Sequence, residues 1–235
     1  MSPNKPERDQ HAPDSPGVPG IGPFLRRIPR QERARAVVDA ILAAAEERLD
    51  HADGPLKPLL LRAGVAAGSF YEYFASRESL LTAVVERVTD RNFSTFLADT
   101  VAVLDRAPTL EQGIRDSAGL IARRYCERLP QLRSIIRIAD RLGLLPYVYR
   151  ERERFAAALS DHTMRFTPDM PRAEHEAMVR AVADALTGLV VVSAYRSPEA
   201  PLAEIERAAG DVAWGVVLVH LGRAGGAGDQ ATRGR

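Results

Sequence analysis

Apolar residues recur at helical spacing from Gln31 onward, and no stretch shows the sustained alternation that is typical of a half-buried strand. The first stripe is long enough for a helix and consists of Val37, Val38, Ile41, Leu42, Ala45 and Leu49. A turn at residues 50–54 is expected to end this helix, because Asp, His and Gly follow one another there. The pattern predicts an all-α fold.

Two short helices are expected next, separated by a glycine. Pro55 and Pro58 can start a helix but cannot continue one, so the second helix should run from about Pro58 to Ala63. Gly64 breaks it, and residues 65–74 are predicted to form the third helix. Ser76 is placed to cap a longer fourth helix. Two short helices joined by a tight glycine turn are the outline of a helix-turn-helix.

The second half of the chain predicts five further helices, with prolines or capping residues at their starts. Thr109 and Gln112 have the spacing of a capping box. The expected ranges are 109–129, 131–142, 146–166, 171–196 and 201–221. We therefore divide the chain into a helix-turn-helix domain at 24–75 and a helical domain at 76–222. Residues 1–23 and 223–235 are rich in proline or glycine and are expected to be disordered tails.

Composition indicates the cellular compartment of the protein better than it indicates a binding partner. The formal net charge is only +1, so the overall charge indicates no particular ligand. Cys126 is the single cysteine, which rules out an intramolecular disulfide and a cysteine-based metal cluster and fits a reducing cytoplasm. The longest apolar run, residues 185–195, is shorter than the roughly 20 residues of a membrane helix. We expect a cytoplasmic protein with no membrane partner.

A short arginine-rich segment precedes the predicted helix-turn-helix. Residues 26–35 contain five arginines, and Glu32 is their only acidic neighbour. Such a run alone is usually a solvated face, but its position favours a phosphate-binding arm, with Arg30 and Arg33 as candidate DNA contacts.

The predicted third helix has two different faces. Phe70 and Phe74 share one face at i,i+4, whereas Ser69 and Glu72 lie on the other, with Tyr71 at its flank. Any helical hairpin has a packed and a free face, so this geometry is weak evidence by itself. We set Glu72 aside as a contact, because a carboxylate beside phosphates is more often tolerated than used.

The residue identities are more specific. The run from Arg62 to Leu81, RAGVAAGSFYEYFASRESLL, resembles the signature of the TetR family of transcriptional regulators. Its AGV turn, its Gly-Ser-Phe-Tyr segment, the aromatic residue before Phe74 and the Arg-Glu pair before two leucines all follow that pattern. The resemblance covers roughly residues 24–90. It implies a repressor that binds a palindromic double-stranded operator as a dimer and is released by a small molecule.

The resemblance also implies site residues. It places Ser69, Tyr71 and Tyr73 of the third helix on DNA, together with Lys57 of the second helix and Arg77 of the fourth. Hydroxyl groups can bond bases or phosphates, and Lys and Arg neutralise phosphate. For Tyr73, a place in the core is an equally good interpretation.

Two features depart from the family pattern. Ala66 and residues 54–56 replace the usual helix-capping Ser or Thr, each of which is normally worth about 1 kcal/mol. Ala67 stands where a longer polar side chain is common, so DNA shape is expected to contribute to operator selection.

The helices of the second half have apolar faces broad enough to enclose a cavity. We therefore expect an effector that is a mostly apolar small molecule. Candidate polar contacts are Tyr125, Arg137, Arg141, Tyr149 and His162, and for each of them a surface or packing role is the more common alternative. Arg137 and Arg141 lie together at i,i+4, where they could hold an anionic ligand or simply face solvent.

The last two predicted helices are the most apolar. The resemblance implies that they pair with their copies in a four-helix homodimer interface, for which Leu189, Val191, Trp214 and Val217 are the candidates. Burial inside one protomer is the alternative, which we consider weaker because both helices look apolar nearly all round.

The sequence gives little support to an enzyme. His175 and Glu176 are followed by Val179 where a zinc-binding helix would need its second histidine, and no glycine-rich phosphate loop or nucleophile elbow is present. We expect no catalytic residue, metal site or cofactor. The remaining alternative is a helical adaptor or dimerisation module that never binds DNA.

Overall fold

The computed structural model describes residues 25–51, 54–196 and 201–232, and this part of the chain contains nine α-helices and no strand. The all-α prediction is confirmed. The helices are α1 (Glu32–Glu46), α2 (Leu56–Ala63), α3 (Ala67–Tyr73), α4 (Arg77–Arg106), α5 (Leu110–Glu127), α6 (Leu129–Arg141), α7 (Leu145–Thr163), α8 (Arg172–Arg196) and α9 (Leu202–Thr232). None of the described helices is long and apolar enough to cross a membrane.

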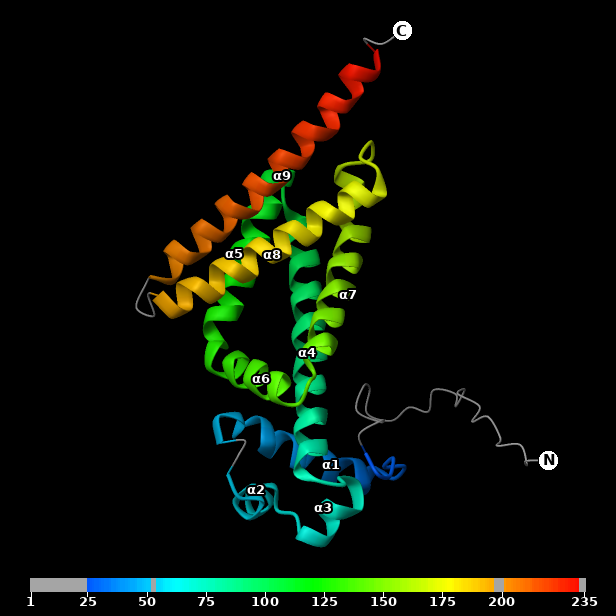
Figure 1. Ribbon diagram of the computed structural model, residues 1–235, viewed down its shortest axis with the longest axis vertical. Coiled ribbons are helices and arrows are strands. Elements are labelled where there is room, and N and C mark those ends of the chain that lie inside the picture. The colour runs from blue at the N-terminus through cyan, green and yellow to red at the C-terminus, as the bar shows by residue number, and fades with distance from the viewer. Residues whose placement is uncertain (1–24, 52–53, 197–200, 233–235) are drawn as a thin grey trace, which may run out of the picture.

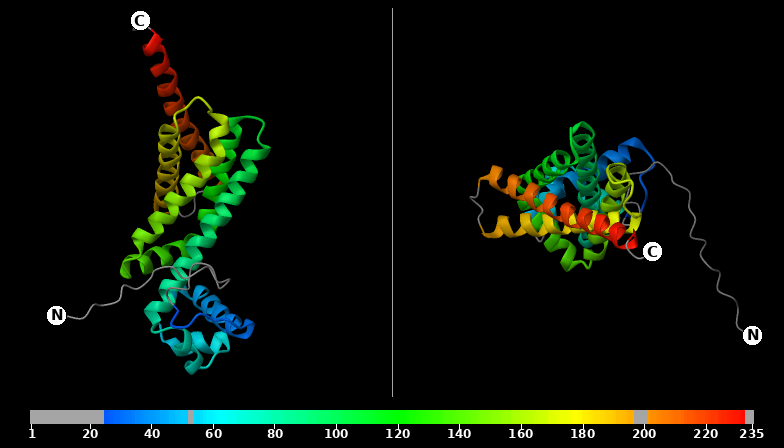
Figure 2. Two further views of the ribbon diagram at one scale, coloured as in Figure 1. Left: turned by 90° about the vertical axis from the view of Figure 1, so that its right-hand side faces the viewer. Right: turned by 90° about the horizontal axis from the view of Figure 1, so that it is seen from above.

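The helices form two parts joined by α4 (Figure 1). Helices α1, α2 and α3 surround the first turns of α4 at one end of the molecule, while α5, α7, α8 and α9 pack at the other end. With 30 residues, α4 is about 45 Å long, so it reaches through both parts. Helix α6 lies across the junction between them, as the views in Figures 1 and 2 show.

The turn between α2 and α3 depends on a glycine. Gly64 ends α2 with φ 65° and ψ 28°, a left-handed conformation that costs a glycine little. The Val65 N–H donates to the Leu60 carbonyl at 3.0 Å, which satisfies one of the last carbonyls of α2. No side chain caps the N-terminus of α2 or of α3, as the missing Ser and Thr residues predict. The backbone conformation of Gly64, without a capping side chain, therefore defines this turn.

The start of α4 is fixed by a reciprocal capping box. The Ser79 N–H donates to the Ser76 Oγ at 3.2 Å, and the Ser76 N–H donates to the Ser79 Oγ at 3.1 Å. Farther along α4, Arg87 forms ion pairs with Asp39 at 2.9 Å and with Glu46 at 3.0 Å. The capping box defines where α4 begins, and the two ion pairs hold α1 against α4.

One hydrophobic core crosses the boundary between the two parts. Phe70 of α3 and Phe74, which directly follows α3, are fully buried, with ring centroids 5.4 Å apart, and they pack in the same cluster as Leu42 of α1. Ile135 and Ile138 of α6 belong to this cluster too. A displacement of α6 would therefore be felt by the helix-turn-helix, because packed cores transmit strain.

The end of α9 differs from the sequence prediction. Helix α9 continues to Thr232, where a tail was expected from residue 223. No proline follows Pro201, so nothing after it removes a helix hydrogen bond, and the glycines after Ala224 do not interrupt the helix. The tail predicted at 1–23 lies outside the described residues.

Candidate DNA-binding surface and ligand cavity

The free face of the helix-turn-helix carries most of the predicted DNA contacts. Lys57 on α2 is exposed, the Tyr71 side chain on α3 is 51% exposed, and Ser69 and Arg77 are half-buried. Arg30 and Arg33, before and at the start of α1, are also exposed and have no ion-pair partner among the described residues. The fold thus brings hydroxyl groups and free cations together at one end of the molecule.

Tyr73 does not belong to this exposed set. Its side chain is only 7% exposed and packs in the core with Phe70, which precedes it by one helical turn. The assignment of Tyr73 to DNA is therefore corrected, and its core interpretation fits the structure. Its position three residues after Phe70 places both rings on the inner face of α3.

The arginine-rich segment is docked on the C-terminal end of α3. The Arg26 N–H donates to the Tyr73 carbonyl at 2.8 Å, and the Arg26 guanidinium donates to the Tyr71 carbonyl at 3.3 Å. The Arg27 Nη1 donates to the Glu72 Oε1 at 2.6 Å. This pair offsets the negative charge of Glu72 on the surface that would face phosphates. Two of the five arginines therefore position α3 in this structure.

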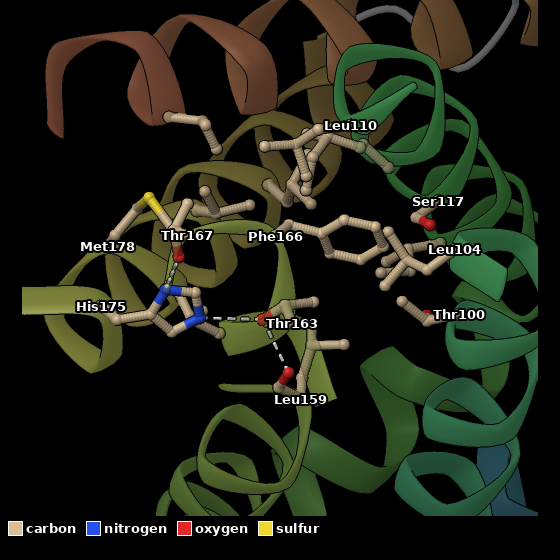
Figure 3. A pocket seen from close by; sticks show the side chains of 17 residues that line it. Thr100, Leu104, Leu110, Ser117, Leu159, Thr163, Phe166, Thr167, His175 and Met178 are labelled. Carbon is tan, nitrogen blue, oxygen red and sulfur yellow. Dashed lines mark hydrogen bonds between the residues drawn. The ribbon is translucent and has the colours of Figure 1, made fainter. Parts of the chain in front are cut away.

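A second candidate site is a narrow cavity inside the other part of the molecule, at the far end of α4 (Figure 3). Its volume is about 50 Å³, and residues of α4, α5, α7, α8 and α9 line it together with the turn after α7. None of the lining residues is Asp, Glu, Lys or Arg. The polar side chains in the wall are those of Thr100, Ser117, Thr163, Thr167 and His175.

His175 is fully engaged by its neighbours. It is 1% exposed, its Nε2 lies 2.9 Å from the Thr163 Oγ1, and its Nδ1 lies 2.8 Å from the Thr167 Oγ1. The Thr163 hydroxyl donates to the Leu159 carbonyl at 2.8 Å, so it can only accept from the imidazole. The proton is therefore assigned to Nε2, and Nδ1 accepts from Thr167. Burial lowers the pKa of His175, which keeps the ring neutral at pH 7.

The sequence did not single out these polar wall residues as ligand contacts. The sequence nevertheless indicated that His175 faces inward. It precedes Met178, Val179 and Val182 at helical spacing and so lies on their apolar stripe. Thr163 and Thr167 lie around the turn between two helices, where hydrophobic periodicity does not predict which way a side chain points. Only the packing of α7 on α8 brings them to His175.

Of the five predicted ligand contacts, only Tyr125 lines a cavity. That cavity is smaller, about 30 Å³, and shares Ile121 and Leu186 with the first. The Tyr125 ring stacks on Phe96 with centroids 5.4 Å apart, and burial raises the pKa of its hydroxyl.

The other four predicted contacts lie away from both cavities. Arg137 and Arg141 are exposed because α6 turns its apolar face to the core shared with α3, and the Arg137 guanidinium donates to the Asp50 carbonyl at 3.5 Å. Tyr149 is 58% exposed. The His162 Nε2 lies 3.1 Å from the Asp105 Oδ1 at the partly exposed surface. Their assignment as ligand contacts is corrected.

One of the four predicted dimer-interface residues lies in the core of the protomer instead. Val217 is 1% exposed, lines the first cavity and packs against Met178, so it is a core residue of the protomer. Leu218 and Val219 are 50% and 53% exposed instead. The other three predicted interface residues, Leu189, Val191 and Trp214, are half-buried.

Within the described ranges, no group of three or more His, Cys, Asp or Glu side chains has an arrangement that could hold a metal ion.

Comparison with known proteins identifies the fold. A protein from Mesorhizobium loti, assigned to the TetR family of transcriptional regulators, is 21% identical with a TM-score of 0.65, over 80% of this chain and 96% of that chain. A transcriptional regulator of the TerR/AcrR family from Aquifex aeolicus is 15% identical with a TM-score of 0.53, over 78% and 99%. SmeT, the repressor of the Stenotrophomonas maltophilia multidrug efflux pump SmeDEF, is 18% identical with a TM-score of 0.50, over 78% and 89%.

No protein-family model and no curated protein sequence matches the chain. The fold is therefore identified by structural similarity: this protein has the fold of the TetR-family transcriptional regulators.

Proposed function

We propose that this protein is a TetR-family transcriptional repressor of the cytoplasm that binds a palindromic operator as a homodimer and is released by a small-molecule effector. The observation that carries the proposal is the exposed face of the helix-turn-helix, where Ser69, Tyr71 and Lys57 lie together at one end of the molecule. The fold shared with transcriptional regulators supports it, as does an internal cavity in the part of the molecule remote from that face.

In this proposal α3 enters the major groove, as the second helix of a helix-turn-helix does. Tyr71 can donate to a phosphate, and Ser69 can bond a base edge or a phosphate. Arg77, held by the capping box at the start of α4, and Arg30 and Arg33 neutralise phosphates. The Arg27–Glu72 pair keeps an unpaired carboxylate away from the DNA.

The test is DNA affinity measured at several salt concentrations with the promoter next to the protein's own gene. Arg77→Ala removes one cation per subunit, so we expect weaker binding and a slope of log K against log salt that is shallower by about 1.8 for a dimer. Tyr71→Phe should weaken binding and leave the slope unchanged, because the lost hydroxyl is uncharged.

Arg207→Ala is the matched control, because Arg207 is exposed on α9 in the part of the molecule remote from α3. It should bind as the wild type does. An unchanged slope in Arg77→Ala would contradict its phosphate contact. A protein that binds no duplex in any salt condition would instead favour the helical adaptor.

The homodimer is proposed to form through the exposed apolar surface of α8 and α9. On α9, Gly215, Leu218, Val219 and Gly222 are exposed at i, i+3, i+4 and i+7, which is one continuous stripe. Val192 on α8 is 48% exposed. Helical faces of this kind are usually covered by a partner.

We expect Val219→Glu to give a folded monomer in sedimentation experiments, because two acidic side chains would be buried in the dimer interface. Leu61→Glu is the control: Leu61 is an apolar residue that is 82% exposed, but it lies on α2, away from α8 and α9. That variant should stay dimeric. A normal dimer in Val219→Glu would mean that the interface lies elsewhere.

A further inference from the structure

Building on the ligand-sensing part of the proposed function, we propose that the cavity among α4, α5, α7 and α8 takes a slim, uncharged, mostly apolar molecule. Its single hydrogen-bonding group is held by the hydroxyls of Thr100 and Ser117.

The wall of the cavity excludes a charged ligand. Its apolar members include Leu104, Ile114, Phe166, Met178 and Val182, and none of the lining residues is acidic or basic. His175, the one titratable group in the wall, is neutral and has both ring nitrogens bonded. An ion in this cavity would lose its hydration without gaining a counter-charge, which is far more costly than burying a neutral group.

Thr100 and Ser117 are the unused polar groups of the wall. Their residues are 1% and 5% exposed, and neither hydroxyl oxygen has a hydrogen-bond partner within the structure. Figure 3 shows both side chains on the same side of the cavity, Thr100 on α4 and Ser117 on α5, with Leu104 between them. Buried polar groups are nearly always bonded, so two exceptions on the same side of one cavity point to a ligand group that completes them.

The other polar groups cannot serve as the anchor. Thr163 and Thr167 bond the two nitrogens of His175, which lies across the cavity from Ser117 and Thr100 (Figure 3). The polar end of the ligand is therefore directed to α4 and α5. A hydroxyl both donates and accepts, so an alcohol or a carbonyl group meets the requirement.

The size of the cavity favours a slim molecule. A volume of about 50 Å³ is well below the roughly 150 Å³ of a protein cavity known to bind benzene. Side chains must therefore move to admit a ligand of several carbons, and an unbranched chain, which is narrow and flexible, can follow the space that they open. Ile121 and Leu186 border both this cavity and the second one, so their rotation would lengthen the available space.

The test compares 1-hexanol, hexanoate and hexylammonium, which share a six-carbon chain and differ in charge. Binding is measured by calorimetry on the full-length protein without DNA, so the outcome does not depend on the proposed operator binding. We expect 1-hexanol to bind at least about tenfold more tightly than either ion. In the double variant Thr100→Val/Ser117→Ala, the affinity for 1-hexanol should fall by about five- to tenfold, as expected for a lost hydrogen bond.

Ser160→Ala is the matched control. Ser160 is fully buried on α7 and its Oγ also has no partner, but it does not line the cavity. This variant should bind 1-hexanol as the wild type does. Binding of either ion as tight as that of 1-hexanol, undiminished binding by the double variant, or no binding of 1-hexanol would each overturn the proposal. Thermal unfolding of every variant separates a lost contact from a lost fold.

Discussion

Replacing Glu86 with glutamine is expected to stabilise the protein at pH 8 by roughly 2–3 kcal/mol and to remove much of the pH dependence of its stability between pH 5 and pH 7.5. Glu86 lies on α4, is 6% exposed, and its Oε2 has no hydrogen-bond partner within the structure. Burial, together with the Glu151 carboxylate, raises the pKa of Glu86 from 4.5 to about 7, and Arg150 opposes the shift.

The protein loses stability as the pH rises because the folded state holds the proton of Glu86 more tightly than the unfolded chain does. Below about pH 4.5 the carboxyl group is protonated in both the folded and the unfolded protein, so burial carries no charge penalty. Between pH 4.5 and pH 7 the unfolded chain has released the proton and the folded protein still holds it. The free energy of unfolding therefore falls as the pH rises through this window, and the loss is complete above pH 7.

Urea unfolding at pH 5, 6, 7 and 8 measures this effect. Glu153→Gln is the matched control, because Glu153 is an exposed acid on α7, two residues after Glu151. That variant should follow the pH dependence of the wild type. If Glu86→Gln did so as well, Glu86 would not be the group that titrates.

DNA affinity is expected to fall by about 5- to 150-fold when 1-hexanol saturates the cavity, which corresponds to a coupling of about 1–3 kcal/mol. The physical route is α4, whose residues Thr100 and Leu104 line the cavity and whose first turns share a hydrophobic core with Phe70 of α3 through Leu80 and Leu81. A ligand that moves the far end of this helix changes the position of the recognition helix at the other end.

Calorimetric titration of 1-hexanol into the free protein and into the DNA complex checks this prediction. By reciprocity, DNA must weaken 1-hexanol binding by the same factor by which 1-hexanol weakens DNA binding. The Thr100→Val/Ser117→Ala variant should need more 1-hexanol for the same release, and Ser160→Ala should behave as the wild type. Equal affinities for 1-hexanol in both states would rule out ligand release, while leaving DNA binding and the ligand class intact.

The sequence alone determined the all-α fold, the helix-turn-helix and the boundaries of several helices, because the signals for them are local. Gly64 ends α2 through its own backbone conformation. Ser76 caps α4 through a residue three positions away, and the Thr109 Oγ1 accepts from the Gln112 N–H at 3.2 Å at the start of α5. Each signal acts within one helical turn, so no knowledge of the tertiary fold is needed to read it.

For the helices of the second half, only the tertiary structure decided which face looks inward. On α9, Val217 is buried and Leu218 is exposed, yet both are apolar and adjacent, so the hydrophobic pattern carries no information on the rotation of the helix. The arginines of α6 share a face, as their spacing predicts, but the packing of α6 on the core around α3 turns that face away from the cavity. Thr100 and Ser117 are unremarkable positions on two different helices, and they become a pair only because α4 packs against α5.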